Sequence, residues 1–312
     1  MMLVLYGPTV TGKTNLAIEI AKKYNGELIS ADSRQIFKRL DIGTGKVSSN
    51  STVKKFPDYW IVDGVKIYGF DIKNPQESFS AAAFIDYAQD CIYNIQREKK
   101  LPIVVGGTGF YIKSLLFGIG TSGVEPNINL RKKLKELTVA ELYETLLRLN
   151  SVKALSLNES DRYNPRRLTR AIEVAASKKL PNTGKPITAN QYKIIVLSAP
   201  NKFLYLRADA WLEKRLELGL EKEIQSLLAS GIDSHWLESL GLEYKWLTQA
   251  SLGIISKDEA INRLKGDIHA YIRRQKTFIR QLKKIDIFDI SKKDWKKSLE
   301  KNLSKLEKIS TT

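Results

Sequence analysis

The chain has 312 residues, of which 43% are hydrophobic and 27% charged, and this length allows one large domain or two modest domains with a substantial hydrophobic core. It has no apolar run long enough to cross a bilayer, and its single cysteine and two histidines exclude an internal disulfide and a metal site built from cysteine or histidine. The 51 Lys and Arg residues against 34 Asp and Glu residues give a formal net charge of +17, which is typical of nucleic-acid binders, although basic helical surfaces give the same excess.

The chain begins with an apolar strand, a glycine-bounded loop and an amphipathic helix. The strand is predicted over residues 3–6 and the helix over residues 13–24. Between them, GPTVTGKT fits the pattern G-x-x-x-x-G-K-[ST], in which backbone N–H groups cradle phosphates. The sequence therefore predicts a phosphate site formed by Gly7, Pro8, Thr9, Val10, Thr11, Gly12, Lys13 and Thr14.

Two residues of this loop have separate predicted roles. Lys13 would reach the phosphates, and the Thr14 hydroxyl would hold Mg²⁺. The N-terminal end of the following helix would add its dipole to the attraction for an anion. A glycine turn without a ligand is the structural alternative. The pattern indicates a polyphosphate ligand and leaves open whether that ligand is ATP.

Two further predicted strands end in polar or glycine-rich segments. Residues 27–31 are followed by Asp32, which is a candidate Mg²⁺ ligand, general base or helix N-cap. Ser33, Arg34 and Gln35 come next, and their side chains can hydrogen-bond base edges. The segment 106–109 is a glycine-rich turn that includes Thr108, or simply packs a helix on a strand. Because ligands of parallel sheets bind outside the carboxyl ends of the strands, we expect all three segments to meet in one crevice.

The rest of the chain is predicted to be mainly helical. Residues 119–190 have the composition of a helical insertion, residues 192–199 form another strand, and nearly everything after residue 203 is helical. We therefore predict an α/β fold, a P-loop NTPase-like parallel sheet wound with helices, over residues 1–118 and 191–290. A helical C-terminal region belongs to this core, and residues 291–312 are predicted to be a basic tail.

Six motifs occur in order along the chain: the phosphate loop, ADSRQIF with LDIGTGK, VVGGTGFY, NESDRYNPRRLTRAIEV, LGLEYKWL and AYIRRQKTF. In this order they resemble the tRNA dimethylallyltransferase family, the bacterial tRNA isopentenyltransferases. The resemblance implies that the loop binds the diphosphate of dimethylallyl diphosphate, with Mg²⁺, and not ATP. It further implies transfer of the dimethylallyl group to N6 of the adenosine 3′ of the anticodon, in tRNAs that read codons beginning with U, with release of diphosphate.

The resemblance also implies roles for single residues. Asp32 would accept the proton from N6, Thr108 would lie beside the reaction centre, and Arg207 would be directed at the leaving diphosphate. The insertion would contact tRNA, and two structural alternatives apply to its arginines and to those near the C-terminus: pairing with nearby acidic residues or packing on aromatic rings. The predicted tRNA contacts are Ser33, Arg34, Gln35, Arg166, Arg167, Arg170, Arg273, Arg274 and Gln275.

The sequence departs from the family pattern at five positions. Val10 and Thr11 replace the usual alanine and serine of the loop, and Val47 replaces a common proline. Trp211 stands where a second arginine usually follows Arg207 by four positions, and Phe278 stands where tryptophan is common. The loop works through backbone amides, so we expect the first two changes to be minor. Trp211 itself is expected to be a core residue.

Three other functions are compatible with parts of the sequence. An isopentenyltransferase acting on free adenine nucleotides is disfavoured by the charge and the insertion, and a small-molecule P-loop kinase is disfavoured by DSRQ and GGTGFY. A non-catalytic RNA-binding module would not need Lys13, Thr14, Asp32 and Thr108. We expect a cytoplasmic protein, because residues 1–6 lack the basic leader of a signal peptide. We also expect a monomer without membrane attachment. Its expected partners are the tRNA anticodon stem-loop and dimethylallyl diphosphate.

Overall fold

The chain divides into two compact units, Met1–Leu116 with Ile187–Thr312 and Phe117–Pro186. The computed structural model describes residues 1–48, 50–119, 123–177, 187–188 and 191–310, with side chains as far as Ser304. The predicted insertion, residues 119–190, overlaps the second unit, although residue 190 lies outside the described residues. Residues 311–312 of the predicted tail also lie outside them.

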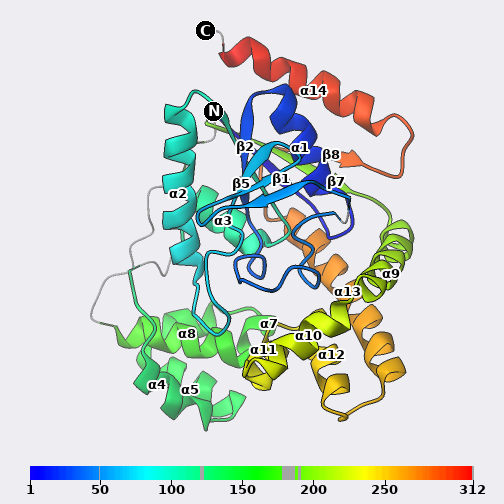
Figure 1. Cartoon of the computed structure of the whole chain (residues 1–312). Coiled ribbons are helices and arrows are strands. Elements are labelled where there is room, and N and C mark those ends of the chain that lie inside the picture. The colour runs from blue at the N-terminus through cyan, green and yellow to red at the C-terminus, as the bar shows by residue number, and fades with distance from the viewer. Residues whose placement is uncertain (49, 120–122, 178–186, 189–190, 311–312) are drawn as a thin grey trace. The chain divides into compact units, whose positions relative to one another are not determined.

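Among the described residues, an eight-stranded sheet forms the centre of the first unit (Figure 1). Its order is β3-β4-β5-β2-β6-β1-β7-β8. From β5 to β8 the neighbouring strands are parallel, whereas β3 and β4 add an antiparallel edge, so the predicted parallel sheet is confirmed for its main part. The strands are β1 Met2–Tyr6, β2 Gly26–Ser30, β3 Val53–Lys55, β4 Trp60–Val62, β5 Val65–Tyr68, β6 Leu101–Gly106, β7 Tyr192–Ser198 and β8 Ile285–Asp289.

The register of the central strands brings three loops to one edge. Tyr6 at the end of β1 lies opposite Gly106 in β6 and Val196 in β7, and Ser30 at the end of β2 lies opposite Val105. The loops that follow β1, β2 and β6 therefore begin at neighbouring points on the carboxyl edge of the sheet.

Helices cover both faces of this sheet, and the side chains of each strand alternate between the two faces. Leu3 and Leu5 of β1 pack in one apolar cluster with α1, whereas the hydroxyl of Tyr6 donates to the backbone oxygen of Gln275 in α13 at 3.0 Å. A second apolar cluster is formed mainly by α9 to α13. The helices of this unit are α1 Lys13–Lys23, α2 Ala81–Arg97, α3 Gly109–Phe117, α9 Asn201–Glu217, α10 Leu220–Ala229, α11 Ser234–Ser239, α12 Leu242–Ser251, α13 Lys257–Ile279 and α14 Trp295–Ser310; α3 ends at the boundary with the second unit.

The C-terminal segment differs from its prediction in two ways. Strand β8 lies in a region that the sequence analysis predicted to be nearly all helix, and it pairs with β7 in parallel. Helix α14, predicted as a basic tail, packs on the core: Leu299 and Leu303 are only 2% and 3% exposed and join the cluster that contains α1. The segment is basic on its outer side because its leucines recur at four-residue spacing and face the sheet.

The second unit is a small helical domain with its own apolar core. Its core residues are Leu134, Leu142, Leu146, Ala154, Leu157, Leu168 and Ile172. Each of its helices starts after an Asn or Thr side chain that accepts a backbone N–H, which is a favourable N-cap. The helices are α4 Ile128–Lys135, α5 Val139–Leu149, α6 Ser151–Leu155, α7 Glu159–Arg162 and α8 Pro165–Ala176.

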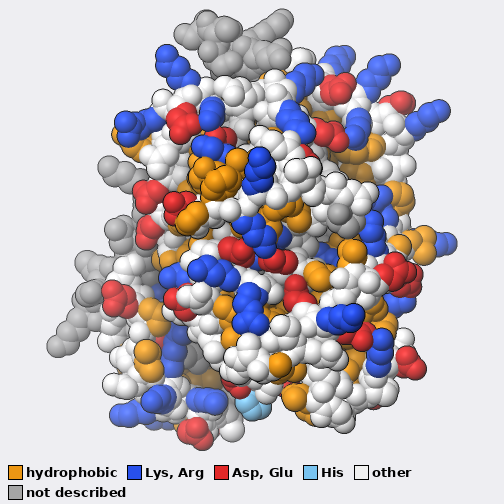
Figure 2. Space-filling model, viewed as in Figure 1, with side chains coloured by type: hydrophobic (Ala, Val, Ile, Leu, Met, Phe, Trp, Pro, Cys, Tyr) orange, Lys and Arg blue, Asp and Glu red, His pale blue; other side chains and the backbone are white. Residues whose placement is uncertain are grey.

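The chain has an excess of basic residues, and charges of both signs are mixed on the face that Figure 2 shows. Figure 2 shows Lys and Arg side chains spread over the visible face among acidic and apolar ones. Within the described ranges, every helix is too short or too polar to cross a lipid bilayer.

Candidate active site

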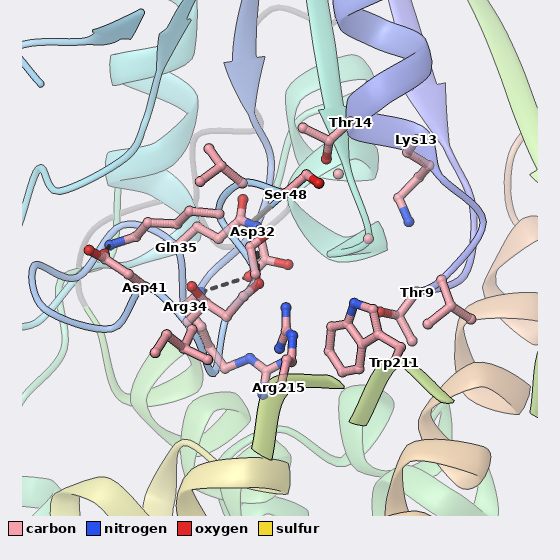
Figure 3. A pocket seen from close by; sticks show the side chains of 18 of the residues that line it. Thr9, Lys13, Thr14, Asp32, Arg34, Gln35, Asp41, Ser48, Trp211 and Arg215 are labelled. Carbon is pink, nitrogen blue, oxygen red and sulfur yellow. Dashed lines mark hydrogen bonds and ion pairs between the residues drawn. The ribbon is translucent and has the colours of Figure 1, made fainter. Parts of the chain in front are cut away.

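A pocket of about 860 Å³ lies at the carboxyl edge of the sheet in the first unit (Figure 3). The three predicted loops contribute Lys13, Asp32 and Gly107 to its lining, among others. Helix α9 contributes Arg207, Trp211 and Arg215, and α12 and α13 contribute Glu243, Tyr271 and Gln275. The structure thus brings the three predicted segments together, as their places after neighbouring parallel strands require.

The phosphate loop leaves β1 through a position that only glycine can fill. A Cβ on Gly7 would lie 2.3 Å from the backbone oxygen of Leu197 in β7. Val10 then has a φ of 61°, an uncommon conformation for a β-branched residue. A residue other than glycine in this conformation carries strain on the order of 1 kcal/mol. Two contacts hold the turn: the Thr11 hydroxyl donates to the Pro8 oxygen at 2.8 Å, and Arg207 Nε donates to the Val10 oxygen at 2.9 Å.

Lys13 and Thr14 start helix α1 and both line the pocket. The Lys13 ammonium donates to the Pro8 oxygen at 2.6 Å, so it folds back over the loop. Burial lowers the pKa of Lys13 to about 8, and the negative charge of Asp32 opposes this shift. The side chain is thus a cation beside a carboxylate in a partly dehydrated site, where an anionic ligand would favour the charged form.

Asp32 and Thr108 lie at the adjoining ends of β2 and β6. Oδ1 of Asp32 accepts the backbone N–H of Arg34 at 3.0 Å, and Figure 3 shows the carboxylate directed into the pocket. The Thr108 hydroxyl accepts the N–H of Ser33 at 3.1 Å, and the Thr108 N–H donates to the Ala31 oxygen at 3.2 Å. The glycine-rich turn therefore holds the segment that carries Asp32.

Arg34 is in an ion pair with a carboxylate distant in sequence. Its Nη1 lies 3.0 Å from Oε2 of Glu243 on α12, which is 1% exposed. Burial disfavours the charge, but the carboxylates of Glu243 and Asp32 outweigh this and hold the pKa of Arg34 above its usual value. Arg34 was predicted to contact tRNA, and this ion pair occupies one edge of its guanidinium.

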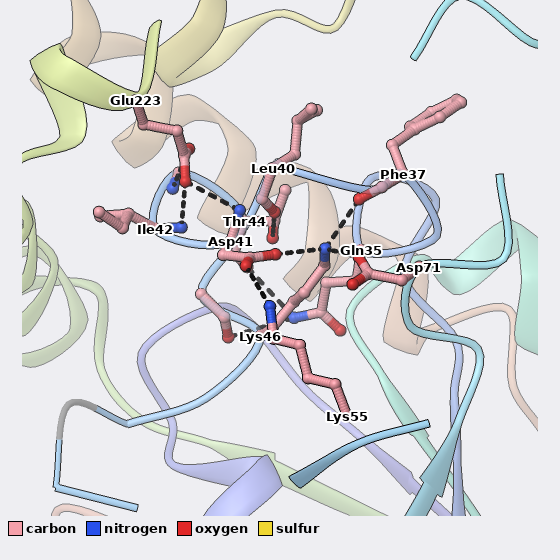
Figure 4. Close-up of polar contacts among 12 residues, drawn as sticks. Gln35, Phe37, Leu40, Asp41, Ile42, Thr44, Lys46, Lys55, Asp71 and Glu223 are labelled. Atoms are coloured by element: carbon pink, nitrogen blue, oxygen red, sulfur yellow. Dashed lines mark hydrogen bonds and ion pairs between the residues drawn. The ribbon is translucent and has the colours of Figure 1, made fainter. Parts of the chain in front are cut away.

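Gln35 and Lys46 both support the Gly43 loop, residues 40–46, which lines one side of the pocket. Nε2 of Gln35 donates to the backbone oxygens of Thr44 at 3.1 Å and Gly45 at 3.2 Å. The buried Lys46 ammonium donates to the Phe37 oxygen at 2.7 Å, lies 2.6 Å from Oδ1 of Asp41, and also contacts Asp71 (Figure 4). The amide of Gln35, predicted for tRNA contact, is thus used within the protein.

Glu223 of α10 also holds the Gly43 loop, through the backbone of residues 41–43. The Glu223 carboxylate accepts the backbone N–H groups of Asp41, Ile42 and Gly43 at 2.9, 2.7 and 3.0 Å, and the hydroxyl of Tyr244 at 2.8 Å. A loop with this many fixed backbone groups forms a firm wall for a ligand.

Gln275 of α13 joins the phosphate loop to the glycine-rich turn. Its Oε1 accepts the N–H of Thr9 at 2.9 Å, and its Nε2 donates to the oxygen of Gly107 at 2.9 Å. The residue is 4% exposed. It was predicted to contact tRNA, but its amide group is directed at these two backbone groups.

A sequence model of IPP transferases matches residues 35–282 of the chain, beginning three residues after Asp32 and leaving out the phosphate loop. The chain belongs to the IPP transferase family. A tRNA dimethylallyltransferase of Acetivibrio thermocellus is 37% identical over 304 residues, covering 94% of each chain. The crystal structure of a tRNA delta(2)-isopentenylpyrophosphate transferase from Staphylococcus epidermidis has a TM-score of 0.68 at 30% identity, covering 98% of each chain. A eukaryotic dimethylallyltransferase acting on tRNA shares the fold, with a TM-score of 0.79 at 23% identity over 99% of this chain and 79% of that one.

The remaining arginines predicted for tRNA binding in this IPP transferase family member have different surroundings. Arg273 donates to the hydroxyl of Tyr205 at 2.9 Å, and Arg274 lies 5.8 Å from the centroid of the Tyr271 ring. Both are exposed, so packing on aromatic residues does not remove them from solvent.

The arginines of the second unit also differ from one another. Arg167 pairs with Asp161, and Arg170 lies 3.1 Å from Glu173, as the structural alternative predicted. Arg166 is exposed, and among the described residues no ion pair involves it.

Several residues of the site were not assigned roles from the sequence. Glu243 lies in the motif LGLEYKWL and Lys46 in the motif LDIGTGK. Their charge inside motifs shared with the family is the signal that could have identified them as site residues. Arg215 had no such signal, because it lies in a helix with many charged residues. Trp211, expected in the core, is half-buried and lines the pocket, and Phe278 packs against Gly109, where a Cβ would lie 2.3 Å from the Phe278 ring.

Proposed function

We propose that this chain transfers a dimethylallyl group from dimethylallyl diphosphate to N6 of the adenosine 3′ of the anticodon, in tRNAs that read codons beginning with U, and releases diphosphate. The observation that carries the proposal is one pocket that holds both the Lys13 ammonium of a phosphate loop and the Asp32 carboxylate. Membership of the IPP transferase family and the names of the relatives support it.

The proposed reaction needs positive charge at the leaving diphosphate and a base at the attacking amine. A bond forms between N6 and C1 of the five-carbon group, while the C1–O bond breaks and its electron pair leaves with the diphosphate. Lys13, Arg207 and the amides of residues 7–14 would stabilise the charge on the leaving group. Asp32 would accept the N6 proton, because an exocyclic amine becomes a good nucleophile only as it loses that proton. Thr108 would hold the turn that carries Asp32, through the N–H of Ser33.

Mg²⁺ fits the donors of this loop. Magnesium in phosphate sites is usually bound by substrate phosphates and one or two protein oxygens. Within the described ranges, the side chains contain no cluster of three or more His, Cys, Asp and Glu that could hold a metal alone, whereas the Thr14 hydroxyl lines the pocket. We therefore assign Mg²⁺ to Thr14 and the diphosphate, where the ion would neutralise part of the charge of the leaving group.

The tRNA would present an unpaired base to the pocket. Unpaired loop bases leave their stack at the lowest free-energy cost, which favours the anticodon loop as the substrate. Ser33, next to Asp32 in the chain, and the exposed Arg166, Arg273 and Arg274 are our proposed contacts to the base and the backbone, with the helical insertion gripping the stem. A cytoplasmic monomer is the proposed working form, and a cytoplasmic location suits an enzyme that acts on tRNA.

The first experiment is transfer of label from radioactive dimethylallyl diphosphate, with Mg²⁺, to unmodified bacterial tRNA and, in parallel, to AMP. Label in tRNA alone is the expected result. Label in AMP alone would replace the proposal with an isopentenyltransferase acting on free nucleotides. Label in neither, together with turnover of ATP, would indicate a kinase.

The role of Asp32 is tested by Asp32→Asn, which keeps the shape of the side chain and removes the base. We expect the rate of transfer to fall by about 10²- to 10⁴-fold, the usual contribution of a general base, while the Kd for tRNA stays within a few fold. Single-turnover rates and filter binding measure the two effects. Asp90→Asn, an exposed change on α2, is the matched control. An equal loss of tRNA binding in Asp32→Asn would show that the carboxylate positions RNA.

A further inference from the structure

The wall of the pocket formed by α9 carries a guanidinium that has no role in the function proposed above. Arg215 is 6% exposed and lies about two helical turns beyond Arg207. Its guanidinium carbon lies 3.3 Å from the centroid of the Trp211 ring, one turn earlier. Figure 3 shows the two side chains together at this wall, with the Lys13 ammonium directed toward the same space.

Arg215 is held in place from three sides. The ring of Trp211 covers one face of the guanidinium, and Nη1 donates to the Gly43 oxygen at 2.6 Å. Gly45 has a φ of +57°, and a Cβ there would lie 1.6 Å from Nη2 of Arg215, so the loop closes directly over the side chain. Stacking uses the flat face of a guanidinium and leaves the N–H groups at its edge available to acceptors.

Arg215 shares its nearest carboxylate with a second guanidinium. Among the described residues, Glu243 is the one carboxylate within ion-pair distance of Arg215, at 3.9 Å, and Glu243 is also paired with Arg34 at 3.0 Å. Two guanidinium groups thus share one buried carboxylate. Burial lowers the pKa of Arg215 to about 10, against the attraction of Glu243. The carboxylates of Glu243 and Glu223 oppose this shift, and an anion in the pocket would give the Arg215 guanidinium a closer negative partner than Glu243 at 3.9 Å.

We propose that Arg215, positioned by Trp211, is a second guanidinium that binds the diphosphate of the prenyl donor, together with Lys13 and Arg207. The inference rests on the function proposed above. Trp211 stands at the position where the family pattern has a second arginine. Because residues four apart in an α-helix lie on the same face, Arg215 can supply that guanidinium from the next turn. Trp211 is then a positioning residue, and Arg215 is the residue that touches the ligand.

The test measures the binding of inorganic diphosphate, with Mg²⁺, by calorimetry, and the binding of tRNA in parallel. Arg215→Met removes the guanidinium and keeps an unbranched side chain. The double variant Trp211→Arg with Arg215→Met moves the guanidinium back by one turn. Arg263→Met is the matched control, because Arg263 also lies over a tryptophan ring, that of Trp246 at 5.1 Å, but outside the pocket.

We expect Arg215→Met to weaken diphosphate binding by about 10- to 100-fold, the effect of a lost charged hydrogen bond. The KM for dimethylallyl diphosphate should rise by a similar factor, and the Kd for tRNA should stay within twofold. The double variant should recover most of the lost diphosphate affinity, and Arg263→Met should bind like the unaltered protein. If Arg215→Met does not fold, Arg215→Lys replaces it, with a smaller loss expected because lysine lacks the planar fork.

Unchanged diphosphate binding in a folded Arg215→Met variant would overturn the proposal and leave Arg215 as a support for Gly43. A loss confined to tRNA binding would overturn it in favour of an RNA contact. A double variant that binds as weakly as Arg215→Met would show that the loss acts through the Gly43 loop. If the unaltered protein binds diphosphate but transfers no label to tRNA, the proposed function fails while the assignment of Arg215 is still tested by diphosphate binding.

Discussion

At the residue scale, Gln275 illustrates how one amide can serve two loops. An amide both donates and accepts, and here its two halves satisfy the partly buried Thr9 N–H and the buried Gly107 oxygen. The resemblance placed Gln275 with Arg273 and Arg274 on the tRNA side of a helix. Neighbouring helical residues point in different directions, however, and Gln275 turns inward while the two arginines stay exposed.

Gln275→Leu should therefore impair the prenyl donor and not the tRNA. The variant leaves the partly buried Thr9 N–H and the buried Gly107 oxygen without the Gln275 amide, which costs about 2 kcal/mol and loosens the phosphate loop. We expect the KM for dimethylallyl diphosphate to rise about tenfold, with the Kd for tRNA within twofold, measured by steady-state kinetics and filter binding. Gln281→Leu, an exposed change near the end of the same helix, should alter neither. Loss of tRNA affinity alone would restore the original prediction for Gln275.

At the element scale, the strands that carry the site were the predictable ones. β1, β2 and β7 contain apolar residues and lead into glycine or polar residues, and the structure has them within about one residue of the predicted bounds. β6 ends at Gly106, where the glycine-rich turn was predicted to begin. The hairpin β4–β5 was not predicted, although Asp63-Gly64 between its strands is a typical two-residue turn, with φ values of 50° and 85°. Its strands are short, and short alternating runs are easily missed beside long helices.

A buried carboxylate ties together two helices of the second unit. Glu173 on α8 accepts the Asn127 N–H at the start of α4 at 2.9 Å and pairs with Arg131 of α4 at 2.7 Å. Burial alone would raise the pKa of Glu173, but hydrogen bonds from Arg131, Asn127 and Arg170 outweigh it and hold the pKa below its usual value. A lowered carboxyl pKa stabilises the fold above the unfolded-state pKa, about 4.3, and this stabilisation is lost as the pH falls through the folded-state value.

Glu173→Gln should therefore destabilise this unit at neutral pH but much less in acid. At pH 7 we expect a loss of about 2 kcal/mol in the protection of α4 and α8 amides, measured by hydrogen exchange. Below about pH 4, the difference from the unaltered protein should shrink, because Glu173 itself becomes protonated there. Glu144→Gln breaks an exposed pair with Arg148 and should change protection by less than about 0.5 kcal/mol. A pH-independent effect of Glu173→Gln would mean that packing, and not charge, holds the helices.

At the scale of the whole molecule, the limits of prediction follow from distance along the chain. The phosphate loop, Asp32 and Thr108 were predictable because each follows a strand, and parallel strands fix where their ends meet. The pair Arg34–Glu243 joins residues 209 positions apart, and no local pattern records such a contact. The contact of Arg215 with the Gly43 oxygen joins residues 172 positions apart, so it could not be predicted from local sequence either.

Net charge also belongs to the whole molecule, and it predicts how tRNA binding responds to salt. With +17 overall and basic side chains spread over the face seen in Figure 2, tRNA affinity should fall steeply as salt rises, because each phosphate contact releases counterions. Arg166→Met should make the slope of log affinity against log salt less steep by about 1, since Arg166 is exposed. Arg167→Met should change it less, because Asp161 already neutralises Arg167. Fluorescence anisotropy of a labelled anticodon stem-loop at several salt concentrations measures the slopes. Equal slopes for all three proteins would remove the second unit from the proposed tRNA surface and leave the binding to the first.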